Sequence, residues 1–241
     1  MPSADGIHLS AATATLAGRV VIPPLSLSLT ERRIGIVGRN GSGKSTLLRL
    51  IGGLVAPSSG TVRVDGIDPS GDRRGLIARL GILFQNPDHQ IIFPLVEEEL
   101  AFGLRQRGLG RDGALAAARA RLAAEGRAHW AAMPATSLSQ GQRHFLCLLS
   151  VLMMEPATLL LDEPFAGLDL PTTARLRRAL DAAPQRLVTV THDPAMLAGY
   201  DRAIWLEEGR VAGDGPPAAV LDAYAAAMEE RARDADTHLA G

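Results

Sequence analysis

One glycine-rich segment determines the structural class of this chain: Gly38-Arg39-Asn40-Gly41-Ser42-Gly43-Lys44-Ser45-Thr46. Its spacing matches G-x-x-x-x-G-K-[ST], in which successive backbone N–H groups surround phosphate oxygens. Lys44 is the only lysine in the chain, and every other basic side chain of the Lys/Arg class is arginine. A compact ammonium can enter a cluster of phosphates, whereas the planar guanidinium needs more room and a fixed geometry. The segment therefore predicts a binding site for a nucleoside triphosphate, and we expect ATP.

The residues on either side of this segment agree with that prediction. Ile34-Gly35-Ile36-Val37 is a short apolar run typical of a buried strand, and Thr46 to Ile51 has helical spacing before Gly52. A strand, a glycine-rich turn and a helix in this order place the phosphates at the helix N-terminus. The Ser45 hydroxyl is then expected to bind a magnesium ion shared with the nucleotide.

Composition limits the alternatives. The chain has 241 residues with a net charge of −1, so nucleic acid is not expected as a partner. Cys147 is the only cysteine, and its apolar neighbours favour a buried thiol. The start, Met1-Pro2-Ser3-Ala4-Asp5, lacks the features of a signal peptide. The longest apolar run, residues 145–154, is too short to cross a bilayer, so we expect a soluble protein.

The pattern along the chain predicts an α/β fold with a parallel sheet. Alternating residues in the first thirty positions predict antiparallel strands. Further strands are expected at 61–64, 80–84, 159–161 and 187–190, a helix at 111–129, a hairpin at 203–212 and a helical tail after Pro217. We expect a nucleotide-binding core formed by residues 1–85 and 156–215, a helical subdomain at 86–155 and a C-terminal helical tail at 216–241.

Polar residues follow three of the predicted strands. Asp162 and Glu163 end one, Gln85 ends a second and His192 ends a third. Ligands of open α/β sheets bind at the carboxyl ends of the strands. One carboxylate can hold magnesium while the other faces the attacking water, the amide of Gln85 can ligate magnesium or orient a water, and the imidazole can hydrogen-bond the terminal phosphate. Without the glycine-rich segment, the alternative interpretation of the acidic pair is a solvated strand end.

Leu138-Ser139-Gln140-Gly141-Gln142 precedes a strongly apolar segment. Ser139 and Gln142 have the spacing of a capping box, which predicts the start of a helix. The same helix N-terminus, with Gly141 permitting close approach, suits a second phosphate contact.

Together these segments resemble the nucleotide-binding subunits of ABC transporters over nearly the whole chain. Residues 38–46 match the Walker A motif, Gln85 the Q-loop, residues 138–142 the signature motif, residues 159–163 Walker B with the catalytic glutamate, residues 167–169 the D-loop and His192 the switch histidine. The resemblance implies a head-to-tail dimer of two such subunits around two ATP molecules. Ser139 and Gly141 of one subunit would close over the γ-phosphate held by Lys44 of the other.

The segment from Gln85 to Gly103 resembles, more narrowly, the ATPases of energy-coupling factor (ECF) importers of vitamins and transition metals. The resemblance implies a peripheral subunit on the cytoplasmic face of the membrane, with an integral membrane coupling subunit and a substrate-binding membrane subunit as partners. The short chain and the wording of Ser139-Gln140-Gly141-Gln142 favour the biotin type. The alternatives are a cobalt or nickel importer and a soluble ABC ATPase without a membrane partner; a small-molecule kinase would leave residues 138–142 without a role.

The expected chemistry is hydrolysis of ATP by direct attack of water. Lys44 neutralises the β- and γ-phosphates, Glu163 polarises the water, His192 stabilises the terminal phosphate, and Ser45, Gln85 and Asp162 hold magnesium. The sequence departs from the family pattern at two places. Gln140 replaces a signature glycine, and Thr13-Ala14-Thr15-Leu16 lacks the aromatic residue that would stack on adenine.

Overall fold

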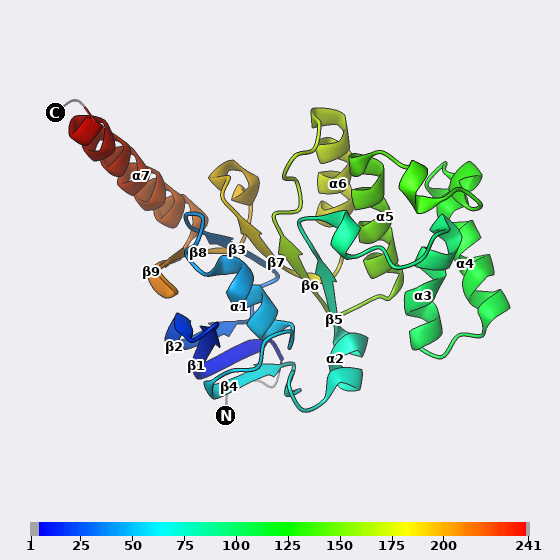
Figure 1. The fold of residues 1–241 in the computed structure, drawn as a ribbon, viewed down its shortest axis with the longest axis horizontal. Coiled ribbons are helices and arrows are strands. Elements are labelled where there is room, and N and C mark those ends of the chain that lie inside the picture. The colour runs from blue at the N-terminus through cyan, green and yellow to red at the C-terminus, as the bar shows by residue number, and fades with distance from the viewer. Residues whose placement is uncertain (1–4, 240–241) are drawn as a thin grey trace. The chain divides into compact units, whose positions relative to one another are not determined.

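The computed structural model describes residues 5–239, with side chains described as far as residue 233. Residues 1–4 and 240–241 lie outside the described residues. They belong to the expected domain and include most of the N-terminal segment considered above. The chain divides into two compact units: unit 1 contains residues 1–76 and 186–241, and unit 2 contains residues 77–185. Figure 1 shows the elements of both units.

Unit 1 begins with an antiparallel sheet in the order β2-β1-β4. Its strands are β1 (Ile7–Leu16), β2 (Arg19–Leu29) and β4 (Ser59–Val64). Alternate residues such as Ile7, Leu9 and Leu27 are buried, because successive side chains of a strand point to opposite faces. The expected antiparallel strands of the N-terminal region are therefore confirmed.

A second set of strands in unit 1 carries the phosphate-binding segment. β3 (Arg33–Val37) pairs in parallel with β7 (Arg186–Thr191) and with β8 (Arg202–Glu207), and β8 forms a hairpin with β9 (Arg210–Gly215). All residues of β3 after Arg33 are buried, as expected of a central parallel strand. α1 (Lys44–Ile51) follows the loop after β3, and the long helix α7 (Pro217–Leu239) packs on β8 and β9 (Figure 1).

Unit 2 is mostly helical around a short parallel pair. β5 (Leu80–Leu83) pairs with β6 (Thr158–Asp162), and all residues of β6 are buried. Its longer helices are α3 (Val96–Gln106), α4 (Arg111–Ala124), α5 (Gln140–Met153) and α6 (Leu170–Asp181); α3 packs on both α4 and α5. Short 3-10 turns lie at Pro87–His89, Ala128–Trp130 and Ala135–Ser137, and a fourth in unit 1 at Pro194–Leu197. Helix α2 (Arg73–Arg79) spans the boundary between the two units in the sequence.

The α/β class is confirmed, with two local differences from the sequence prediction. The helix expected at 111–129 ends at Ala124, because Gly126 adopts a φ of +67° and breaks the helical path. Helix α6 was not anticipated, although Asp169 caps it and Pro171 lies in its first turn. Among the described residues, no helix is both long and apolar enough to cross a membrane.

Candidate nucleotide site

Residues 38–46 form the loop expected between β3 and α1, and we call them the phosphate loop. The loop leaves β3 at Gly38 and enters α1 after Gly43, the N-cap residue, which has a φ of +100°. A Cβ on Gly38 would collide with the carbonyl oxygen of Leu206 and lie 2.6 Å from the Ser42 hydroxyl oxygen. The loop therefore passes so close to its neighbours that only glycine fits at this position.

The polar atoms of this loop are arranged for an anionic ligand. The Lys44 ammonium donates to the carbonyl oxygens of Gly38 at 2.6 Å and Arg39 at 3.0 Å, and its side chain is almost fully buried. The hydroxyl oxygen of Ser42 is buried and has no hydrogen-bond partner among the described residues. Buried polar groups in proteins are normally satisfied. A phosphate at the positive end of α1 would supply acceptors for both the Lys44 ammonium and the Ser42 hydroxyl. The residues present therefore fit the triphosphate of a nucleoside triphosphate.

His192 lies at the same edge of unit 1 as the phosphate loop. In the parallel pairing of β3 with β7, Val37 is opposite Thr191, so Gly38 and His192 are the first residues beyond a matched pair. His192 is exposed. The Thr191 hydroxyl accepts a hydrogen bond from the Asp193 N–H at 3.1 Å, which fixes the backbone just after the imidazole. The structure thus brings His192 and the phosphate loop to adjacent strand ends.

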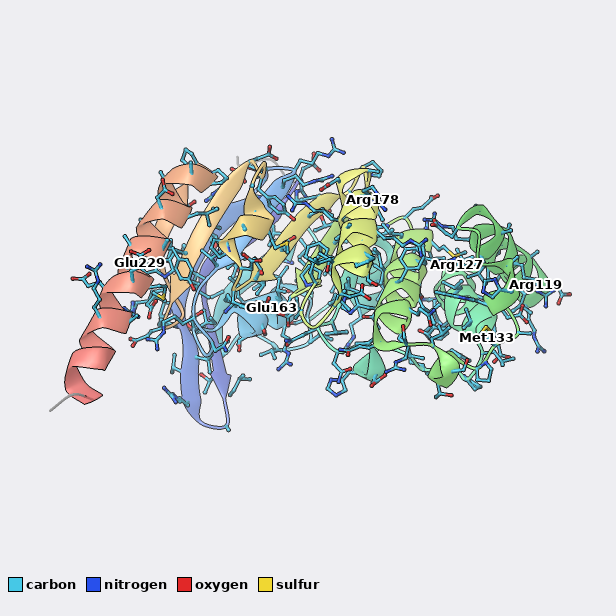
Figure 2. All side chains as sticks on the ribbon, turned by 90° about the horizontal axis from the view of Figure 1, so that it is seen from above. Arg119, Arg127, Met133, Glu163, Arg178 and Glu229 are labelled. Atoms are coloured by element: carbon cyan, nitrogen blue, oxygen red, sulfur yellow. The ribbon has the colours of Figure 1, made fainter. Side chains whose placement is uncertain are left out.

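Unit 2 brings together a second set of predicted residues. Leu83 of β5 is opposite Leu161 of β6, so Gln85 and Glu163 each lie two residues beyond a matched pair. Asp162 and Glu163 are nearly fully buried, whereas Gln85 is exposed. Glu163, labelled in Figure 2, directly follows β6 and has a φ of +49°. This left-handed conformation is rare outside glycine and is concentrated at functional sites.

The predicted capping box at the start of α5 is confirmed. The Ser139 hydroxyl oxygen accepts from the Gln142 N–H at 3.3 Å, and the Gln142 side chain accepts from the Ser139 N–H at 2.8 Å. A Cβ on Gly141 would lie 3.0 Å from the Thr172 methyl carbon, so this first turn packs tightly on α6. Gln140, at the place of the family's glycine, takes part in the helix without a positive φ.

Sequence reasoning missed the side chains that hold this region in place. Arg143 donates to the Leu138 carbonyl at 2.6 Å and pairs with the Asp88 carboxylate at 2.9 Å, which ties the start of α5 to the segment after Gln85. The Asp169 carboxylate accepts from the Thr172 N–H at 2.8 Å and caps α6. Hydrogen bonds from Thr172 lower the pKa of Asp169. No sequence pattern indicated the ion pair between Arg143 and Asp88. Asp169, by contrast, is a residue type that often caps a helix, and its position before Leu170 could have predicted the start of α6.

Two titratable groups in α5, His144 and Cys147, are buried, and for Cys147 this confirms the expectation from its apolar neighbours. Burial lowers the pKa of His144 to about 4, while a hydrogen bond with the Pro164 backbone opposes this effect. Burial, followed by the charges of Glu99 and Asp88, raises the pKa of Cys147 to about 12. His144 therefore stays neutral and Cys147 stays a thiol at neutral pH. Because Pro164 follows Glu163, His144 supports the backbone next to the candidate catalytic carboxylate.

The candidate residues thus form two sets, each within one unit: the phosphate loop with His192 in unit 1, and Gln85, Asp162, Glu163, Ser139 and Gly141 in unit 2. Across the described part of the chain, no group of three or more His, Cys, Asp or Glu side chains could hold a metal ion by itself.

Comparison with known proteins identifies the family. The model of the ABC transporter family matches residues 24–166, a span that contains the phosphate loop, Gln85, the start of α5 and Glu163. This chain belongs to the ABC transporter family. It is an ATP-binding subunit of that family and an ATPase.

Named relatives cover nearly the whole ABC chain. It is 56% identical to the biotin transport ATP-binding protein BioM of Rhodobacter capsulatus over 229 residues, which are 95% of this chain and 98% of that protein. It is 39% identical to BioM of Rhizobium etli over 225 residues, 90% of this chain and 97% of that protein. The predicted resemblance to ATPases of biotin transporters is therefore confirmed.

Solved structures confirm the ABC ATPase fold. CbiO1 from Clostridium perfringens, part of the ABC transporter complex CbiONQ, is 28% identical, with a TM-score of 0.76 over 90% of this chain and 91% of that chain. A dimeric ATP-binding cassette in a post-hydrolysis state with ADP and Pi bound is 25% identical, with a TM-score of 0.76 over 88% of this chain and 98% of that chain.

Proposed function

We propose that this ABC subunit hydrolyses ATP to drive an ECF-type importer of biotin, as a peripheral subunit on the cytoplasmic face of the membrane. The observation that carries the proposal is the phosphate loop at the start of α1, with its buried Lys44 ammonium and Ser42 hydroxyl, in a chain 56% identical to a biotin transport ATP-binding protein. The similarity to CbiO1, part of CbiONQ, makes a cobalt or nickel importer the second candidate.

In this proposal the phosphate loop binds the triphosphate. Backbone N–H groups of residues 38–46 and the Lys44 ammonium neutralise the β- and γ-phosphates, and His192, at the end of the neighbouring strand, donates to the terminal phosphate. The Glu163 carboxylate takes the proton of the attacking water and aligns its lone pair with the γ-phosphorus. Because phosphoryl transfer depends on positioning and charge neutralisation, the left-handed backbone of Glu163 is an orienting feature of the site.

Ser45, Gln85 and Asp162 would hold the magnesium ion. Hydroxyl, amide and carboxylate oxygens are the donors that this hard cation prefers, and its charge would offset the negative charge of the phosphates. Ser45 follows Lys44 in the first turn of α1, and Gln85 and Asp162 lie beyond matched residues of β5 and β6. We propose that one magnesium ion takes ligands from both units.

We further propose that the subunit works as a dimer in which Ser139 and Gly141 contact the γ-phosphate bound by the other subunit. The capping box uses the Ser139 hydroxyl oxygen only as an acceptor, so its proton remains able to donate to a phosphate. The positive N-terminal end of α5 favours the same anion. Gly141 allows this first turn to pack closely on Thr172 of α6, and in the proposal its backbone N–H contacts the γ-phosphate.

The proposed contact for the membrane coupling subunit lies on residues 85–103 and the helices beside them. Ile92 is 68% exposed, and the Phe93 and Phe102 rings pack 5.2 Å apart. A hollow of about 120 Å³ lies next to them, lined by Phe93, Glu98, Ala101, Arg105, Arg111 and Leu115. An exposed apolar side chain beside a hollow with a polar rim suits a helix of a membrane subunit.

Glu163→Gln tests the catalytic assignment. The variant keeps the size and hydrogen-bonding shape of the side chain but cannot accept the water proton, so we expect ATP turnover to fall at least a hundredfold with nucleotide binding retained. The same variant should accumulate as an ATP-bound dimer in size-exclusion chromatography. Unchanged turnover would contradict the role of Glu163.

A pull-down from detergent-solubilised membranes of the native host, followed by mass spectrometry, tests the transport role. Recovery of integral membrane subunits whose vesicles take up labelled biotin supports the proposal. Uptake of cobalt or nickel instead would select the second candidate. Absence of any membrane partner would favour a soluble ABC ATPase.

A further inference from the structure

The turn between β8 and β9 lies directly against the phosphate loop, within unit 1. The Gly209 N–H donates to the Ser42 carbonyl oxygen at 2.8 Å. Glu207 is paired with Arg210 across the hairpin, so Glu208 and Gly209 form its two-residue turn, with φ values of +48° and +74°. Two consecutive positive φ values are typical of the tight turn that suits the twist of a β-hairpin. The hairpin therefore presents a backbone donor to the middle of the loop.

The turn has no room for a side chain at Gly209. A Cβ there would collide with the carbonyl oxygen of Val21 and would lie 2.7 Å from the Pro23 ring. The same part of β2 reaches the phosphate loop, since a Cβ on Gly43 would lie 2.8 Å from the Ile22 side chain and 3.5 Å from the Gly209 Cα. The phosphate loop is thus enclosed between β2 and the β8–β9 turn.

Glu207, two residues before Gly209, connects this turn to α7. Its carboxylate accepts from the Trp205 indole N–H at 3.2 Å and from the Arg231 guanidinium at 2.8 Å. Burial acts to raise the pKa of Glu207, but Arg231, Trp205 and the charge of Arg39 outweigh it and lower the pKa. Arg39 belongs to the phosphate loop, so the pKa of Glu207 depends on charges both on the loop and on α7.

Apolar packing supports the connection. The Trp205 ring meets the Tyr224 ring edge-on at 5.7 Å, and Tyr224 belongs to a buried cluster with Val37 and Leu197. Val37 immediately precedes the phosphate loop. Helix α7 therefore contacts β8 through an aromatic pair and an ion pair, and β3 through the apolar cluster that contains Val37.

We propose that Gly209 and Glu207 are positioning residues of the phosphate loop, and that α7, through Arg231, sets the affinity of the subunit for nucleotide. The backbone N–H groups of the loop bind phosphate only when their directions are fixed. The Gly209 hydrogen bond fixes the Ser42 peptide, and the Arg231–Glu207 pair holds the hairpin that carries Gly209. The proposal rests on nucleotide binding at the phosphate loop and is independent of the transported molecule.

The test measures the dissociation constant for ADP, with magnesium, by calorimetry on the full chain. Gly209→Ala should weaken ADP binding about tenfold, since the new Cβ displaces the turn from the loop. Arg231→Ala should weaken it about two- to fivefold, because the pair is partly exposed and its loss releases but does not displace the hairpin. Glu207→Gln, which keeps hydrogen bonding but removes the charge, should have a smaller effect of the same sign.

Arg233→Ala is the matched control. Arg233 lies on the same helix and its removal changes the charge equally, but its guanidinium donates to the Glu229 carbonyl oxygen within α7, on the stretch labelled in Figure 2. We expect its ADP affinity to be unchanged. The loss of ADP affinity in Arg231→Ala should also be smaller in 1 M salt, because screening weakens the ion pair in the wild type. In the same variant, kcat at saturating ATP should stay within twofold of the wild type while KM rises.

If Gly209→Ala does not fold, the Arg231 and Glu207 variants still decide the matter. Wild-type ADP affinity in both, or an equal loss in Arg231→Ala and Arg233→Ala, would overturn the proposal. ADP binding needs neither hydrolysis, dimerisation nor a membrane partner. A failure of this inference is thereby separate from a failure of the transport function, which the turnover and pull-down experiments report.

Discussion

The ammonium of Lys44 donates to the carbonyl oxygen of Gly38 at 2.6 Å, across the phosphate loop to which both residues belong. A second bond, to the Arg39 carbonyl oxygen at 3.0 Å, leaves the side chain little freedom. Since only 7% of Lys44 is exposed, most of the rotamer entropy of the lysine has been lost before a phosphate binds. The loop is therefore preorganised by its own carbonyl groups.

Lys44→Arg should abolish this preorganisation. The planar guanidinium cannot occupy the same enclosed position, so we expect the dissociation constant for ATP to rise at least tenfold with a melting temperature within a few degrees of the wild type. Calorimetry and thermal unfolding measure the two quantities. Arg49→Lys, an exposed change on the same helix, is the control and should bind normally. Wild-type affinity in Lys44→Arg would mean that charge alone, and not shape, is required.

His144 should make the stability of the protein fall in mild acid. Its pKa is lowered from 6.5 to about 4 by burial, so the unfolded chain takes up a proton that the folded chain rejects. The contribution is fully present above about pH 6.5 and is lost as pH falls towards 4. At about 1.36 kcal/mol for each pH unit, the loss between pH 7.5 and 5 is about 2 kcal/mol.

The measurement is urea unfolding of the wild type and of His144→Gln at both pH values. The glutamine variant should lose about 2 kcal/mol less than the wild type over this range, because it cannot take up the proton. His129→Gln, an exposed change, should behave as the wild type does. Equal pH dependence in the wild type and His144→Gln would show that other groups cause the loss.

Cys147 should be inert towards thiol reagents in the folded protein. Burial raises its pKa to about 12, so almost no thiolate exists at pH 8 and the sulfur is inaccessible. We expect a chromogenic disulfide reagent to react fully in denaturant and at least a hundredfold more slowly without it. Ser10→Cys, at an exposed position of β1, provides an accessible thiol for comparison. Similar native rates for the two thiols would place Cys147 on an open surface.

The sequence predicted the parts of the site that are local in the chain. Three features depend only on residues adjacent in the sequence, and the structure contains all three: the phosphate loop, the polar residues at the ends of β5, β6 and β7, and the Ser139–Gln142 capping box. It did not predict the Gly209 hydrogen bond to Ser42, the Arg231–Glu207 pair or the burial of His144 beside Pro164. These contacts join residues distant in sequence, and no periodicity or spacing encodes them.

The sequence also did not predict the left-handed backbone conformation of Glu163. Glutamate has no intrinsic preference for positive φ, and the conformation is imposed by the turn that follows β6. Helix α6, by contrast, has an aspartate cap and a proline in its first turn, and those signals predict a helix start.

The pairing of Leu83 with Leu161 has a consequence for protein engineering. Gln85 and Glu163 stand two residues beyond this pair, so their spacing depends on backbone hydrogen bonds between β5 and β6 and not on the length of the intervening segment. Residues 86–157 can thus be exchanged for those of a relative with another membrane partner while the two side chains keep their register. A one-residue insertion within either strand would shift one of them by about 3.3 Å. If residues 138–142, which include Ser139 and Gly141, are retained, chimaeras joined outside the strands separate the choice of membrane partner from the chemistry.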